Sequence, residues 1–291
     1  MKTGSARLQV LAAAILFSTG GAGIKAAAFS GLQVSTLRSG IAAIALALFF
    51  QGRLKWSRHV LGVGLVYGAT LTLFVLSTKL TTAANAIFLQ STAPLYLLLL
   101  SPWVLRERIT RRDVFYLAGV VAGLAFCVAG RTPATATAPN PALGNLLGVL
   151  CGMVWASTLL GLRYLGRDAD RQGTAMAAVI AGNVFASAAA LPFAWPMPDA
   201  PITEWATIAY LGVFQIALAY ALLTTAVRRL QALEVSLLLL LEPVLNPAWT
   251  WLIRGERPGA WTIAGGAIIV SVTAAKNLYE AYGNRAEGSA V

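Results

Sequence analysis

Histidine, cysteine and charged residues are all scarce in this chain. His59 is the only histidine among 291 residues, which excludes a histidine-based metal site, a histidine proton relay and a serine–histidine pair. Cys127 and Cys151 lie within apolar runs, where a thiol behaves as a small buried hydrophobe, so we expect no disulfide. These absences argue against an enzyme, and we expect no catalytic residue, no metal ion and no cofactor.

Only 11% of the residues are charged, 58% are hydrophobic, and the mean hydropathy is +0.72. Such a composition cannot cover a soluble surface, so the lipid bilayer is the expected solvent. About 20 apolar residues cross the hydrocarbon core as a helix. The sequence predicts an all-α membrane protein with ten transmembrane helices, near residues 8–26, 34–50, 60–78, 83–104, 113–130, 143–163, 173–195, 204–226, 232–253 and 259–275.

The net charge of +11 comes from basic residues at the ends of these spans, not from one stripe, so we expect no nucleic-acid partner. Of the 22 lysines and arginines, 16 fall on the side of the N-terminus. The other six are Lys25, Arg38, Lys79, Arg131, Arg254 and Arg257. This bias predicts cytoplasmic N- and C-termini in a cell inner (plasma) membrane.

The first 30 residues have an alternative interpretation as a cleaved secretory signal, with Lys2 and Arg7 before an apolar run. Against this alternative, the segment matches a later one. Phe17 precedes Trp155, and Lys25 precedes Arg163, by the same 138 positions.

A longer internal repeat supports duplication of the whole chain. The run from Pro94 to Glu107-Arg108 recurs 149 positions later, from Pro243 to Glu256-Arg257. Five spans per repeat is an odd number, so the two repeats must be inverted, as in many transporters. We therefore predict a first five-helix repeat at 1–131, a Pro/Thr/Ala-rich linker at 132–142, a second repeat at 143–275 and a polar tail at 276–291.

Glycines four positions apart recur in three spans and predict close helix packing, not ligand-binding loops. These glycines are Gly64 and Gly68, Gly119 and Gly123, and Gly144, Gly148 and Gly152.

Polar residues at membrane depth are the candidate site, because they are costly in lipid and tend to face cavities. Glu242 lies about ten residues, or about 15 Å, into the ninth span. Asn246 follows one turn later on the same face, and Ala93 occupies the position equivalent to Glu242 in the first repeat. Glu242 is interpreted either as a ligand- or proton-binding group or as a protonated acid that hydrogen-bonds a neighbouring helix.

Other spans contribute further candidates. Thr92 and Tyr96 share a face of the fourth span, and Trp155 lies deep in the sixth, where its ring could stack a flat substrate. Gln215 and Tyr220 are expected on different faces of the eighth span, so at most one should line a cavity. Arg38 is expected to reach the outer interface, which leaves no fixed cation at the midplane.

Two stretches resemble a known family. AYALLTTAVRRLQALEVSLLLLLEPVLNPAWTWLIRGERP is similar to the second-half signature of EamA-type members of the drug/metabolite transporter superfamily, and TTAANAIFLQSTAPLYLLLLSPWVLRERIT resembles the first-half signature. Within that superfamily the chain looks most like YddG-type exporters of aromatic and other hydrophobic amino acids. The resemblance implies ten helices, inverted halves and a central cavity, with structural helix-end roles for Glu107-Arg108 and Glu256-Arg257.

The resemblance and the residues together predict export of amino acids, as small-molecule substrates, by alternating access. The expected substrate-binding residues are Trp155, Glu242, Asn246, Tyr96, Thr92, Phe74 and Gln215. Trp155, Tyr96 and Phe74 would form the ring-stacking wall, with Glu242 and Asn246 as its polar partners. Cationic drugs paired with Glu242 are the competing substrates, sugar phosphates rank lower for want of a cation, and a channel or a membrane scaffold is the alternative from another class.

Overall fold

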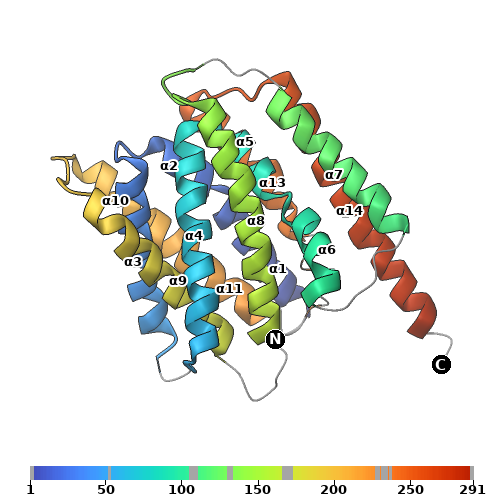
Figure 1. Ribbon diagram of the computed structural model, residues 1–291. Coiled ribbons are helices and arrows are strands. Elements are labelled where there is room, and N and C mark those ends of the chain that lie inside the picture. The colour runs from blue at the N-terminus through green and yellow to red at the C-terminus, as the bar shows by residue number, and fades with distance from the viewer. Residues whose placement is uncertain are drawn as a thin grey trace.

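The computed structural model describes residues 3–51, 54–104, 111–129, 134–165, 173–226, 230, 235 and 238–288. Every named regular element within these ranges is a helix, and an isolated bridge between Thr135 and Ala138 is the one extended pairing there. The all-α prediction is therefore confirmed for the described part of the chain. Figure 1 shows a bundle of helices that run roughly side by side, with α7 and α14 forming a pair along one flank.

The helices lie where the apolar runs predicted them. In the first half they are α1 (Thr3–Ser18), α2 (Gly20–Ala26), α3 (Gly31–Phe49), α4 (Arg58–Leu80), α5 (Ala83–Gln90), α6 (Ala93–Val104) and α7 (Arg111–Ala129). In the second half they are α8 (Pro141–Leu165), α9 (Thr174–Ala190), the 3₁₀ turn η2 (Leu191–Phe193), α10 (Ile202–Tyr210), the π-helix η3 (Leu211–Leu218), α11 (Ala219–Ala226), α13 (Leu241–Arg254) and α14 (Ala260–Gly288).

Among the described residues, six helical segments are long and apolar enough to cross a bilayer. They are Gly4–Ala26, Gly31–Phe49, Arg58–Leu80, Pro141–Leu162, Thr174–Phe193 and Ile202–Ala226. Two shorter apolar helices, Asp113–Ala129 and Ala260–Lys276, accompany them. The protein is thus a multi-pass membrane protein.

The fourth predicted span is a broken helix, and the ninth restarts at an equivalent proline. α5 ends at Gln90, and α6 starts at Ala93 with Pro94 in its first turn. In the second half, α13 starts at Leu241 with Pro243 in its first turn. Proline has no N–H to donate and is tolerated in the first turn of a helix, where that donor is not needed.

The two halves of the sequence pack into each other. α4 packs against α8 and α9, α3 against α9 and η3, and α1 against α11 and α13, while α7 pairs with α14. Each of these contacts joins a helix of the first half to one of the second. The core of the bundle is therefore an interface between the halves, and a cavity at its centre is lined by both.

The glycine pairs form packing seams, as the sequence predicted. A Cβ atom on Gly68 would lie 2.8 Å from the carbonyl oxygen of Gly182 in α9, and one on Gly123 would lie 2.8 Å from that of Gly265 in α14. A Cβ on Gly144 would lie 2.5 Å from the backbone nitrogen of Thr81. These distances are too short for any side chain, so glycine is required for the helices to approach this closely.

The last helix is longer than expected. A polar tail was predicted from residue 276, but α14 continues as helix to Gly288. Residues 276–288 include Ala, Glu, Leu and Lys, which are strong helix formers, and a helix already nucleated by a buried segment extends easily through them.

Candidate functional site

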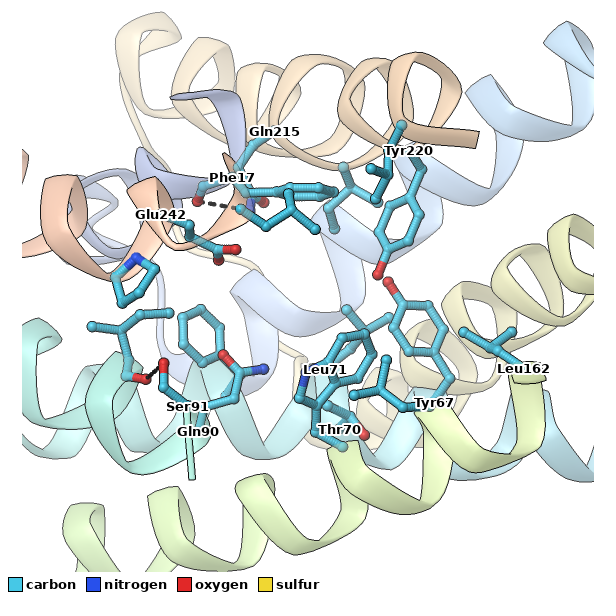
Figure 2. Close-up of a pocket in the computed structure, with 18 of the residues that line it drawn as sticks. Phe17, Tyr67, Thr70, Leu71, Gln90, Ser91, Leu162, Gln215, Tyr220 and Glu242 are labelled. Atoms are coloured by element: carbon cyan, nitrogen blue, oxygen red, sulfur yellow. Dashed lines mark hydrogen bonds between the residues drawn. The ribbon is translucent and has the colours of Figure 1, made fainter. Parts of the chain in front are cut away.

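A cavity of about 290 Å³ lies at the centre of the bundle, between the two halves. Figure 2 shows it lined on one side by α1, η3, α11 and α13 and on the other by α4, α5 and α8. Its volume is at the lower end of the range typical of small-molecule sites. Its apolar aliphatic lining consists of Leu71, Ile87, Leu159, Leu162, Ile216, Leu223, Leu239 and Pro243.

Four aromatic side chains form a continuous wall along the cavity, which we call the aromatic wall: Trp155, Tyr67, Tyr220 and Phe17. The ring centroids of Trp155 and Tyr67 are 6.1 Å apart, those of Tyr67 and Tyr220 are 5.9 Å apart, and those of Tyr220 and Phe17 are 5.1 Å apart. The hydroxyls of the two tyrosines point toward one another (Figure 2). The first half of the chain supplies Phe17 and Tyr67, and the second half supplies Trp155 and Tyr220. The two ends of the wall, Phe17 and Trp155, also occupy corresponding positions in the sequence repeat.

Four of the seven predicted substrate-binding residues line this cavity: Trp155, Glu242, Phe74 and Gln215. Thr70, Gln90 and Ser91 add polar groups that the sequence did not single out as binding residues. Tyr67 was also missed, because a tyrosine in an apolar span carries no signal that separates cavity lining from core. Whether any of these side chains binds a substrate stays a prediction.

Glu242 is the second residue of α13, and its carboxylate points into the cavity (Figure 2). Among the described residues it has no hydrogen-bond or ion-pair partner. A carboxylate in the first turn of a helix is stabilised by the unpaired N–H groups and by the positive end of the helix dipole. The start of α13 before Pro243 therefore places Glu242 near the positive end of the helix dipole, although its carboxylate bonds to no described group.

Arg38 corrects the sequence prediction most strongly. It was expected to reach the outer interface, but it lies in the middle of α3, is 1% exposed and lines the cavity. In the described part of the chain, its Nε and Nη2 have no hydrogen-bond partner. α3 packs against α9 and η3, so the guanidinium is enclosed by neighbouring helices. A residue near a free helix end could instead have extended its side chain to water. The expectation of no fixed cation at the centre is therefore wrong.

Gln215 and Tyr220 both line the cavity, although they were expected on different faces. The reason is the π-helix η3, which contains Gln215 and ends two residues before Tyr220. In an α-helix, side chains five residues apart point in different directions. The wider turns of a π-helix, with its i→i+5 hydrogen bonds, bring such side chains closer to the same face. Gln215 Nε2 also donates to the Phe17 carbonyl oxygen at 3.5 Å, which ties the π-helix to the end of α1.

Asn246 does not line the cavity, although it shares a face of α13 with Glu242. It is fully buried one turn farther along, where α2 packs against α13. A Cβ atom on Gly21 would lie 2.2 Å from its Oδ1, so the side chain lies directly against the α2 backbone. In the described structure neither Oδ1 nor Nδ2 has a hydrogen-bond partner. The shared face was right, but the cavity ends before this depth.

Thr92 and Tyr96 also lie outside the cavity lining. The Thr92 hydroxyl donates to the Leu89 carbonyl at 2.6 Å, and both side chains lie near Gly152 of α8. Tyr96 packs against the apolar cluster that contains Tyr116 of α7. The break between α5 and α6 is the cause, because it rotates the residues after Ser91 away from the face that an unbroken helix would present.

The bundle has a tightly bonded layer at the end where α2, α4 and α13 finish, which we call the Lys25 end. Lys25 Nζ lies 3.3 Å from Glu256 Oε2, and their side chains are 2% and 5% exposed. The same ammonium donates to the carbonyl oxygens of Thr81, at 2.6 Å, and Thr137. Lys25 thus combines two hydrogen bonds to backbone carbonyls with an ion pair to Glu256. Glu256 Oε1 accepts from the Ala83 N–H, 2.7 Å away, at the start of α5.

Further polar bonds hold this layer together. Asn145 Oδ1 in α8 accepts from Thr81 Oγ1 at 2.7 Å and from Asn85 Nδ2 at 3.1 Å. Asn85 Oδ1 in turn accepts from Thr262 Oγ1 of α14 at 2.7 Å. The network joins helices of both halves, and none of its members lines the cavity. Of the family's helix-end Glu-Arg marks, Glu256 is bound structurally here, and Glu107-Arg108 lie outside the described residues.

Comparisons with known proteins agree with this architecture. The pseudopaline exporter CntI of Pseudomonas aeruginosa, strain UCBPP-PA14, is 29% identical over 189 residues, which are 64% of this chain and 63% of that protein. The CntI protein of strain PAO1 matches with the same identity and coverage. The chain thus matches less than two thirds of the length of these curated relatives. One solved crystal structure has the same fold, with a TM-score of 0.61 and 21% identity over 95% of this chain and 97% of that one.

The EamA-like transporter family matches the chain twice, at residues 5–129 and at residues 142–275. Together the two matches cover nearly the whole sequence and fall on its two halves. The chain therefore belongs to the EamA-like transporter family.

Proposed function

We propose that this protein is a secondary transporter that exports amino acids with aromatic or other hydrophobic side chains, by alternating access through the central cavity. The observation that carries the proposal is the cavity itself. It is of small-molecule size, lies between the two halves, and combines an aromatic wall with the unpartnered carboxylate of Glu242.

The chemistry of the lining suits such a substrate. An aromatic or branched side chain would pack on Trp155 and Tyr67, because an aromatic contact is worth about 0.5–1.5 kcal/mol beyond the burial of its area. An ammonium group would pair with Glu242. Gln90 and Gln215 offer amide groups that can donate to or accept from the substrate. Restarted or broken helices that expose polar groups at mid-membrane are the usual way in which transporters build such sites.

The relatives support a small organic metabolite as cargo. The CntI proteins are named as exporters of pseudopaline. That substrate is theirs, and it supports export of a small molecule here without specifying an amino acid.

We further propose ten membrane spans in two inverted repeats, with both termini cytoplasmic. Inverted repeats would relate span one to six and span three to eight, and two helix contacts support the proposal. The contact of α4 with α8 joins spans three and six, and the contact of α1 with α11 joins spans one and eight. Reporter fusions after Pro141 and Asp199 should then report outside, and fusions after Arg111 and Arg171 inside. A cytoplasmic signal after Asp199 would contradict this topology.

Alternating access requires that the cavity be closed on one side at a time, and we assign closure of the outer side to the Lys25 end. Its charged groups are bonded to each other and to backbone across the two halves. Release of a substrate to the outside would require these bonds to open.

Counterflow in liposomes tests the proposed function. Purified protein in liposomes preloaded with unlabelled amino acid should accumulate labelled phenylalanine or leucine, with or without a pH gradient. Trp155→Ala should reduce counterflow of phenylalanine severalfold at unchanged protein yield, since it removes one end of the aromatic wall. Export of cationic drugs would appear as counterflow of amines only. A channel would give flux without accumulation, and a scaffold would give none.

A further inference from the structure

The central cavity holds two opposite charges that do not pair with each other. Arg38 of α3 and Glu242 of α13 both line it. Within the described structure they form no ion pair with each other, and Arg38 Nε and Nη2 have no hydrogen-bond partner at all. An unpaired charge that is removed from water costs several kcal/mol in general, so a protein rarely retains one without a use for it.

Among the described residues, no carboxylate forms an ion pair with Arg38. The side chains closest to it electrostatically are Tyr67, Tyr220 and Cys151, which carry hydroxyl or thiol groups and not carboxylates. The guanidinium presents a planar fork of N–H donors that matches the geometry of a carboxylate or a phosphate. At 1% exposure it can meet such an anion only inside the cavity.

We propose that Arg38 binds the carboxylate of the substrate in the cavity that Glu242 also lines, so that the cavity selects zwitterions over amines. This inference rests on the proposed transport function and adds the substrate's charge pattern to it. An ammonium on Glu242 and a carboxylate on Arg38 would satisfy both unpartnered groups at once. An amine without a carboxylate satisfies Glu242 but leaves Arg38 unpaired and repels it. Arg38 would therefore disfavour cationic drugs and favour amino acids.

The selectivity test compares phenylalanine with phenethylamine, which is the same molecule without its carboxylate. Both are assayed by counterflow in liposomes with wild-type protein, Arg38→Gln, Arg38→Lys and Trp155→Ala. The wild type should prefer phenylalanine. Arg38→Gln should lose about ten- to a hundredfold in apparent affinity for phenylalanine, as expected for a lost charge-assisted contact. Its affinity for phenethylamine should not fall and should rise if the repulsion between Arg38 and the amine is removed. Arg38→Lys should retain part of the preference, because it keeps the charge but not the fork.

Trp155→Ala serves as the matched control, because the aromatic wall contacts the part that the two compounds share. Trp155→Ala should lower the apparent affinity for phenylalanine and for phenethylamine by a similar factor. If Arg38→Gln also weakens both equally, or weakens neither, Arg38 does not read the carboxylate and the inference is wrong. If the wild type transports neither amino acids nor amines, the proposed function fails instead.

A second measurement tests Arg38 without any substrate. If the guanidinium is reserved for a ligand, Arg38→Gln breaks no internal bond, and the apparent melting temperature of the detergent-solubilised protein should stay the same or rise. A sharp fall would show that Arg38 is a structural residue and would overturn the inference, whatever the transported compound proves to be.

Discussion

Buried charged side chains are paired at the Lys25 end, whereas those of the central cavity are unpartnered among the described residues. At the Lys25 end, Lys25 donates to two backbone carbonyls and forms an ion pair with Glu256, and Glu256 also accepts from a backbone N–H. In the cavity, Arg38 and Glu242 lack partners among the described residues. Charges that are paired with each other and with backbone hold helices together, whereas charges without a partner in a cavity are available to a ligand. Under the proposed function, the contrast separates residues that hold the fold from residues that serve transport, although all four are ionisable groups in an apolar protein.

The largest expected effect on stability is at Lys25. Lys25→Met should lower the free energy of unfolding by about 3–5 kcal/mol, because it leaves Glu256 buried without its counter-charge and two carbonyls without a donor. Unfolding of the detergent-solubilised protein, followed by tryptophan fluorescence, measures the change. The double variant Lys25→Met/Glu256→Met should recover part of the loss. A single variant as stable as the wild type would remove the contrast between the two regions.

A smaller loss of stability is expected when the uncharged hydrogen bonds of the Lys25 end are removed. Asn145→Ala removes the acceptor of Thr81 and Asn85, and leaving buried donors unpaired should cost about 1–3 kcal/mol. Ser157 of the same helix is the control, because its hydroxyl bonds only to the Met153 carbonyl of its own helix. Ser157→Ala should change the melting temperature little. Equal changes in melting temperature for the two variants would mean that the hydrogen bonds between helices stabilise the protein no more than a bond within one helix.

Glu242→Gln should have the smallest effect on stability and a clear effect on transport. The carboxylate has no described partner to lose, and glutamine keeps the size of the side chain. Counterflow should lose its dependence on pH or its affinity for amines, since glutamine can neither pair with an ammonium nor carry a proton. Wild-type transport by this variant between about pH 5 and pH 8 would instead support the interpretation of Glu242 as a structural acid.

Much of the fold follows from features that the sequence displays directly. Apolar runs located the helices, and glycines four apart located the packing seams. Gln215 and Glu242 were predicted in the cavity lining because polar groups are costly at membrane depth, and Trp155 and Phe74 because their rings could form a wall for a flat substrate.

The errors all arise where helices deviate from a regular α-helix or where neighbours decide an environment. The π-helix η3 brings Tyr220 beside Gln215, and the break at Ser91 turns Thr92 and Tyr96 away. No periodicity in the residues reveals either one. Arg38 was misplaced because its depth depends on the helices that surround α3, which a single span cannot show.

The aromatic wall is supplied nearly equally by the two halves, but the acid is not, since Glu242 stands where the first half has Ala93. A cavity built from two similar halves would accept a ligand in either of two orientations. Under the proposed function, the single carboxylate removes that equivalence, because a substrate ammonium can pair with a carboxylate in one half only. A framework that matches the same family model twice would thus acquire a direction from a side chain that has no counterpart in the other half.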